Sequence, residues 1–138
     1  MELREVNMLE KLKEVGKNSY SPYSHFRVAT IVIMKDGTEF KGVNVENAAY
    51  GSSICSERSA ILSAISNGYT KGDFKELHCL CLDSNRVSTS CFGCRQVISE
   101  LFDKDALLYF YSNNGDVKSF TVSELCPYPF NEEDLKWK

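Results

Sequence analysis

The 138-residue chain lacks several features that mark special classes of protein. It contains no run of 18 or more apolar residues, which excludes an ordinary transmembrane helix. Its first residues, Met1–Glu5, are acidic and lack the apolar core of a signal peptide. These absences predict a cytoplasmic protein that does not associate with a membrane.

The sequence also lacks a block of like charges. The formal net charge is -3, and no basic stripe of the kind that nucleic-acid-binding domains carry is present. This charge pattern predicts a small-molecule ligand and no nucleic-acid partner. Any activity on polynucleotides is disfavoured for the same reason.

Internal repeats, low-complexity segments and linkers are absent as well, so we expect one domain over residues 1–138. Helical spacing predicts a first helix around residues 6–15, ended by Gly16. Later helices are expected around residues 60–65 and 97–102, and a short one from Asn131 in the tail, residues 125–138. Apolar or β-branched runs predict five strands, at 28–34, 38–45, 77–82, 106–111 and 117–122, the last at a sheet edge. This order predicts a three-layer α/β/α fold with a mixed five-stranded sheet.

Cysteine carries most of the chemistry that the sequence offers. The two histidines, His25 and His78, suggest no function, whereas six cysteines in a reducing compartment favour a metal site over disulfides. Cys91 and Cys94 are spaced to bind one ion at the start of a helix, and Cys55 starts another helix, near Ser53 as a candidate N-cap. Helix N-termini stabilise thiolates, so these three cysteines form a candidate zinc site.

Three thiolates leave the fourth zinc position to water, whose pKa the metal lowers. Glu57, two residues after Cys55, is placed to take the proton of that water. Arg58 is expected to offset the thiolate charge, with Arg95 as a less certain helper. A closed structural site remains open as an alternative, because Cys79 or Cys81 could be a fourth ligand. Both also fit buried free cysteines in a strand, and spacing alone supports the open and closed sites equally.

Four blocks in order and in register resemble the small homotetrameric, zinc-dependent cytidine deaminases, and the similarity extends from about residue 5 to 135. The blocks are Tyr20-Ser21-Pro22-Tyr23-Ser24-His25-Phe26-Arg27-Val28, Gly42-Val43-Asn44-Val45-Glu46-Asn47-Ala48-Ala49-Tyr50, Cys55-Ser56-Glu57-Arg58 and Cys91-Phe92-Gly93-Cys94-Arg95-Gln96. The resemblance implies hydrolysis of cytidine and deoxycytidine to uridine and deoxyuridine plus ammonia, a step of pyrimidine salvage.

In that family pattern, a zinc-bound hydroxide attacks C4 of cytosine while a glutamate shuttles protons. The resemblance implies that Cys55, Cys91 and Cys94 bind Zn²⁺, that Glu57 is the proton shuttle and that Arg58 neutralises thiolate charge. It also implies a substrate site in which Phe26 packs on the pyrimidine and Asn44 and Glu46 bind the ribose hydroxyls. Ala48, Tyr50 and Phe130 would reach the sites of neighbouring subunits in a homotetramer.

Each of these residues also has an ordinary structural interpretation. Phe26 fits a core residue, Asn44 and Glu46 fit turn formers, and Arg58 and Tyr50 fit surface residues. Glu57 alone fits a solvated carboxylate in a first helical turn.

The chain departs from the family pattern at several positions. Ser90 stands where proline is usual, Phe92 where glycine is usual, and Ser56 where alanine is usual, while Ala29-Thr30 replaces Gly-Ala. Serine loosens the geometry of the backbone carbonyl at position 90, and we expect Phe92 to narrow the pocket rim. These changes keep open a second hypothesis, deamination of another aminopyrimidine nucleoside or antibiotic. A third is a structural zinc domain without catalysis.

Overall fold

The computed structural model describes residues 1–136, and its centre is a five-stranded sheet. The strands are β1 (Val28–Met34), β2 (Glu39–Val43), β3 (Phe74–Cys81), β4 (Phe102–Tyr111) and β5 (Val117–Thr121). They lie in the order β2-β1-β3-β4-β5, antiparallel except for the parallel pair β3–β4. The predicted mixed five-stranded sheet is therefore confirmed, with β5 at an edge. No helix within residues 1–136 is long and apolar enough to cross a membrane.

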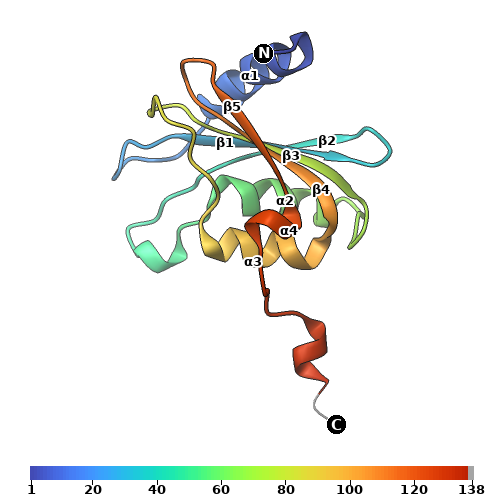
Figure 1. The fold of residues 1–138 in the computed structure, drawn as a ribbon. Coiled ribbons are helices and arrows are strands. Elements are labelled where there is room, and N and C mark those ends of the chain that lie inside the picture. Colours follow the sequence, from blue (N-terminus) through green and yellow to red (C-terminus); the bar gives the residue numbers. More distant parts are fainter. Residues whose placement is uncertain (137–138) are drawn as a thin grey trace.

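Helices cover both faces of the sheet (Figure 1). Helix α1 (Leu3–Gly16) packs on one face, while α2 (Ser56–Ser66), α3 (Phe92–Leu101) and the short α4 (Val122–Leu125) lie on the other. Alternate residues of β1 serve the two layers: Ala29 and Ile31 belong to the core under α1, Val32 and Met34 to the core under α2 and α3. The predicted three-layer α/β/α architecture is confirmed.

Most predicted elements have their expected places, and the bounds of β1 and the end of α1 at Gly16 are as predicted. The tail helix is a 3₁₀ turn, Glu132–Leu135, capped by Asn131, and residues 137 and 138 of the predicted tail lie outside the described residues.

The predicted C-terminal end of the third helix is wrong. Phe102 does not continue helix α3 but opens β4 in an extended conformation. Its ring stacks on Phe74 of the neighbouring strand at 4.7 Å, a long-range contact that helical spacing cannot reveal.

The C-terminal end of the predicted fifth strand also differs. Val122 leaves the strand and begins α4, because Thr121 and Glu124 form a capping box that starts a helical turn.

Helix α2 is set close to the sheet at Gly42 of β2. A Cβ atom at this position would lie 2.3 Å from the backbone nitrogen of Ala60 and 2.6 Å from the carbonyl oxygen of Ser56. Only glycine allows so near an approach of strand and helix. This contact sets the depth at which the N-terminus of α2, with Cys55 and Glu57, meets the sheet.

Candidate metal centre and active site

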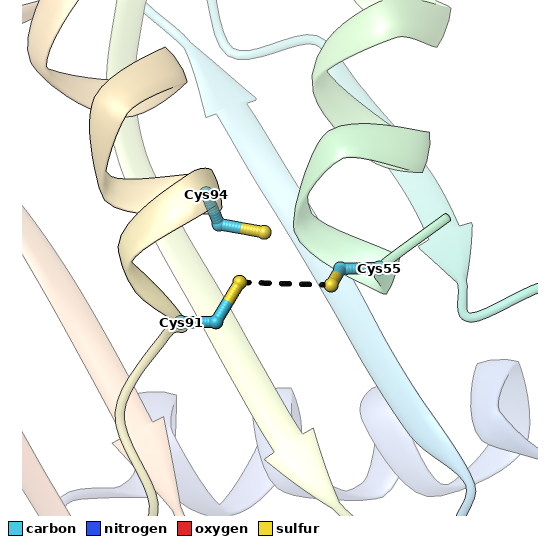
Figure 2. A group of neighbouring side chains, drawn as sticks. All are labelled: Cys55, Cys91 and Cys94. Carbon is cyan, nitrogen blue, oxygen red and sulfur yellow. Dashed lines mark hydrogen bonds between the residues drawn. The ribbon is translucent and has the colours of Figure 1, made fainter. Parts of the chain in front are cut away.

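The three cysteines predicted as zinc ligands come together at the N-termini of two helices. Cys55 is the N-cap of α2, Cys91 is the N-cap of α3, and Cys94 lies in the first turn of α3. Their sulfur atoms lie within 4.8 Å of one another, and the sulfurs of Cys55 and Cys91 are 3.8 Å apart (Figure 2). A tetrahedral ion with Zn–S bonds of about 2.3 Å separates its sulfurs by about 3.8 Å. The cluster therefore fits Zn²⁺.

Ser53 is not the helix cap that the sequence suggested. Its hydroxyl instead accepts a hydrogen bond from the backbone N–H of Asn47, at 3.1 Å. Cys55 takes the N-cap position, with extended backbone and no side-chain cap bond. This geometry aims the Cys55 sulfur away from its own helix and toward α3, as Figure 2 shows.

The cluster needs a cation to hold three thiolates together. In the chain alone, a hydrogen bond with the Cys94 thiol is the main cause that lowers the pKa of Cys55, to about 5, with burial opposing and Arg58 assisting. The pKa of Cys94 is raised, first by that same hydrogen bond and then by burial and the charge of Glu57. One thiolate is thus stable beside a protonated thiol, and a divalent cation supplies the charge that ionising all three requires.

Arg58 lies beside the cluster as expected. Its Nη2 donates to the sulfur of Cys55 at 3.5 Å, and this bond, followed by one to Cys94, raises the pKa of the guanidinium. Arg95 is not a second thiolate partner. Its Nε donates to the carbonyl oxygen of Ser90 at 2.9 Å, and its other nitrogens donate to Thr89 and the carbonyl of Leu125.

Cys79 and Cys81 lie outside the ligand group. Among residues 1–136, the one group of three or more candidate ligand atoms that lie within 4.8 Å of one another consists of the sulfurs of Cys55, Cys91 and Cys94. Both remaining strand cysteines are buried, and burial is the main cause that raises their pKa, for Cys81 to about 11. They behave as core thiols, so the geometry favours three protein ligands and an open position.

A cavity of about 400 Å³ adjoins the cluster, within the range typical of small-ligand sites. Glu57 lines it, and the residue is only 5% exposed, so the solvated-carboxylate interpretation does not apply. The other lining residues are Phe26, Val28, Asn44, Glu46, Ser53, Ile54, Cys55, Ser56, Cys79, Cys81, Ser88 and Thr89. Three predicted substrate residues, Phe26, Asn44 and Glu46, thus share one cavity with Glu57.

Asn44 and Glu46 also organise the cavity wall. The Asn44 side chain accepts from the backbone N–H of Val28 at 2.9 Å and donates to the carbonyl of Phe26 at 2.8 Å. Glu46 accepts from the backbone N–H groups of Tyr23 and Ser24 at 3.0 and 3.1 Å. A hydrogen bond from the Ser24 hydroxyl is the main cause that lowers the pKa of Glu46. The loop before β1 is therefore tied to the end of β2.

Three predicted substrate residues do not line this cavity. Ala48 and Tyr50 are exposed, and Tyr50 faces a separate shallow hollow beside Tyr23 and Ser53. Phe130 is in the tail, 57% exposed, where its carbonyl accepts from Gln96 Nε2 at 2.7 Å. Figure 1 shows the 3₁₀ turn Glu132–Leu135 of the tail lying away from the body of the molecule. Their assignment to the sites of neighbouring subunits stays a prediction.

The two unusual residues of the second cysteine block lie differently from expectation. Phe92 does not line the cavity: its side chain is 74% exposed and lies under the guanidinium of Arg95, 4.2 Å from the ring centre. Ser90 is buried, and its hydroxyl has no hydrogen-bond partner among the described residues. Its carbonyl is held by Arg95, which restrains the backbone where proline is absent.

Comparison with known proteins places this geometry in a family. Residues 3–110 match the family described as "Cytidine and deoxycytidylate deaminase zinc-binding region". The chain belongs to this zinc-dependent deaminase family.

Individual relatives agree with the assignment. The chain is 37% identical over 128 residues to a cytidine deaminase of Halalkalibacterium halodurans, covering 93% of this chain and 95% of the relative. It is 35% identical to a cytidine deaminase of Sporosarcina psychrophila, covering 94% and 93%. A crystal structure of cytidine deaminase from Burkholderia pseudomallei matches with a TM-score of 0.87 at 33% identity, covering 94% of this chain and all of that one. The deaminase identity and the zinc cofactor inferred from the sequence are confirmed.

Sequence reasoning named Thr30 and Ser56 as departures from the family pattern but missed that their hydroxyl groups meet beside Glu57. Thr30 of β1 and Ser56 of α2 are both fully buried, and their hydroxyl oxygens are 2.8 Å apart. Ser56 was recognisable as a departure from the usual alanine, but its partner lies 26 positions away. Only the packing of α2 against β1 brings the two together.

Proposed function

We propose that this deaminase hydrolyses cytidine and deoxycytidine to uridine and deoxyuridine, releasing ammonia, as a step of cytoplasmic pyrimidine salvage. One observation carries the proposal: a buried carboxylate, Glu57, lines a cavity of nucleoside-compatible size together with Cys55, whose sulfur converges with those of Cys91 and Cys94. Zinc deaminases use this combination to replace the exocyclic amino group of a pyrimidine by oxygen.

Each of the site residues has its own role in the proposed reaction. Cys55, Cys91 and Cys94 would hold Zn²⁺, which when bound lowers the pKa of a water molecule so that it can act as a nucleophile near neutral pH. Glu57 takes a proton from that water, delivers it to the ring nitrogen next to C4, and later carries one to the departing ammonia. Arg58 limits the negative charge of the thiolates through its bond to Cys55.

The cavity wall supplies contacts for the rest of a nucleoside. Phe26 offers its ring to the pyrimidine face, and Glu46 offers carboxylate oxygens to the ribose hydroxyls. Asn44 holds the Phe26–Val28 segment and lines the same cavity, so we assign it to the ribose as well.

Assembly would complete the site. Ala48, Tyr50 and Phe130 are exposed and lie outside the cavity of their own chain, so they are available to a neighbouring copy. We therefore propose a homotetramer in which adjacent subunits share active sites. Sedimentation of the zinc-loaded protein as a tetramer supports this arrangement, and a catalytically active monomer contradicts it.

The test of the activity is the fall in ultraviolet absorbance when purified, zinc-replete protein is added to cytidine, with ammonia measured in parallel. Glu57→Gln keeps the size of the side chain and removes its proton-carrying carboxylate. Activity in the wild type that is lost in Glu57→Gln, at unchanged zinc content, supports the proposal. Absence of ammonia release from every cytosine nucleoside rejects it.

One observation keeps a second substrate class in view. The buried Ser90 hydroxyl has no partner among the described residues, and it lies next to Cys91, where proline is usual. Ser90 follows Thr89, which lines the cavity, so the absence of proline here bears on the shape of the wall that meets the substrate. A panel of cytidine, deoxycytidine and modified aminopyrimidine nucleosides decides between the two: cytidine among the best substrates removes the second candidate.

A further inference from the structure

The carboxylate of Glu57 lies at the end of a chain of buried hydroxyl groups. Ser56 Oγ donates to Glu57 Oε1 at 3.0 Å, and Ser56 Oγ lies 2.8 Å from Thr30 Oγ1. Thr30 and Ser56 are fully buried and Glu57 is 5% exposed. The chain runs from the sheet, through the first residue of α2, to the group that the proposed function uses for proton transfer.

The number of protons that the two hydroxyl groups can donate fixes which group is the donor in each hydrogen bond. A hydroxyl has one proton to donate, and Ser56 gives its proton to the carboxylate. In the bond between the two hydroxyls, Ser56 must therefore accept and Thr30 must donate. Both hydroxyls are satisfied in this arrangement, as buried polar groups require, and all dipoles point toward Glu57.

The chain of hydroxyl groups leaves the two oxygens of the Glu57 carboxylate in different environments. Oε1 is held by Ser56, whereas no group within residues 1–136 donates a hydrogen bond to Oε2. Glu57 lines the cavity, and Oε2 is not among the buried atoms that lack a partner. Oε2 is thus the oxygen open to the cavity. Fixing one oxygen of a carboxylate restricts the torsion that places the other.

We propose that Ser56 is a positioning residue for Glu57, supported by Thr30, and that it fixes the carboxylate rotamer so that Oε2 faces the reacting atoms. The inference rests on the proposed function, because it concerns the geometry of the proposed proton shuttle. Alanine, usual at position 56 in the related pattern, keeps the helix but removes the donor to Oε1. It also leaves the Thr30 hydroxyl without its acceptor.

The experiment compares Ser56→Ala, Thr30→Val and Thr30→Ser with the wild type and with Ser63→Ala, a control elsewhere on α2. Misplacement of a catalytic group by about 1 Å can cost about 100-fold in rate. We expect Ser56→Ala to lower kcat by about 10-fold or more with little change in KM or zinc content. Thr30→Val should lower kcat less, Thr30→Ser should restore it relative to Thr30→Val, and Ser63→Ala should match the wild type.

The kcat of a double variant tests whether Thr30 acts through Ser56. If Thr30 acts through Ser56, adding Thr30→Val to Ser56→Ala lowers kcat no further. Crystal structures of the wild type and Ser56→Ala supply a measurement independent of turnover: the Glu57 carboxylate should keep one rotamer only when Ser56 is present.

The outcomes separate this inference from the proposed function. An active wild type with an unchanged kcat in Ser56→Ala overturns the positioning role and leaves the function standing. A loss that follows zinc content, or that appears in KM alone, overturns it as well. A wild type inactive on all cytosine nucleosides rejects the proposed function, and an unchanged Glu57 rotamer in the Ser56→Ala crystal then rejects the positioning role independently.

Discussion

Arg58 lies one turn after Cys55 on helix α2, and its guanidinium donates a hydrogen bond to the Cys55 sulfur at 3.5 Å. A residue that sequence alone could place on a solvated helix surface is therefore a direct partner of the candidate zinc ligands. Its Nη2 makes this contact, while its Nε is buried and has no hydrogen-bond partner among residues 1–136.

Replacing Arg58 should weaken zinc binding. Arg58→Gln removes the positive charge that compensates three thiolates, and loss of such an outer partner typically costs about 10- to 100-fold in metal affinity. Competition with a chromogenic chelator measures the affinity. Arg86→Gln, at an exposed arginine outside the cluster, serves as the control and should bind zinc like the wild type. Equal affinity in Arg58→Gln would show that its charge does not stabilise the site.

Zinc content should distinguish the three ligands from the two core cysteines. Cys91→Ser should bind less than one zinc per chain after dialysis, because it removes one of the three convergent sulfurs. Cys79→Ala and Cys81→Ala should retain one zinc per chain, since neither belongs to the cluster. Elemental analysis of the purified variants provides the measurement. Loss of zinc from Cys79→Ala or Cys81→Ala would instead favour a closed, structural site.

Gly42→Ala should destabilise the protein by about 2–3 kcal/mol, the upper range for overpacking. The added Cβ meets backbone atoms of Ala60 and Ser56, which cannot move aside as a flexible side chain can. Urea unfolding followed by circular dichroism measures the change. Gly51→Ala, where an added Cβ meets nothing within 4 Å, is the matched control. Similar stability of the two variants would contradict the close approach of α2 and β2.

A buried polar cluster on the opposite face of the sheet should make stability depend on pH. Glu76 pairs with Arg4 and accepts from His78 Nε2 at 2.9 Å, and the bond to His78 is the main cause that lowers the pKa of Glu76 from its ordinary 4.5. Because the native pKa is the lower one, this stabilisation is complete above about pH 4.5 and is lost as the pH falls through the native pKa.

Glu76→Gln should therefore cost about 1.5–3 kcal/mol at pH 7, the range for hydrogen bonds to charged groups. The difference from the wild type should shrink in acid, at pH values below about 4.5. Urea unfolding of both proteins across this range provides the comparison, with Glu100→Gln, at an exposed carboxylate, as the control. A difference that stays constant with pH would exclude ionised Glu76 as its source.

The sequence by itself determined the elements whose signals are local. Apolar runs and helical spacing are set by neighbouring residues, so β1, α1 and the order of strands and helices were predictable. The Cys91–Cys94 spacing is equally local, because both residues lie on one helix N-terminus. Cys55 at the start of a second helix and Glu57 two residues after it were candidates from the sequence as well, and the resemblance to a deaminase family implied the same assignments.

Tertiary structure decided the relationships between distant segments. Cys79 and Cys81 lie outside the cluster of candidate ligands. Arg95 donates to the carbonyl of Ser90 and not to the thiolates, and Phe92 does not line the cavity. Tertiary structure also set Thr30 against Ser56, although 26 positions separate them. The physical reason is the same in each case: which polar groups meet depends on how deeply α2 and α3 pack against the sheet, and that depth depends on contacts such as Gly42 with Ala60.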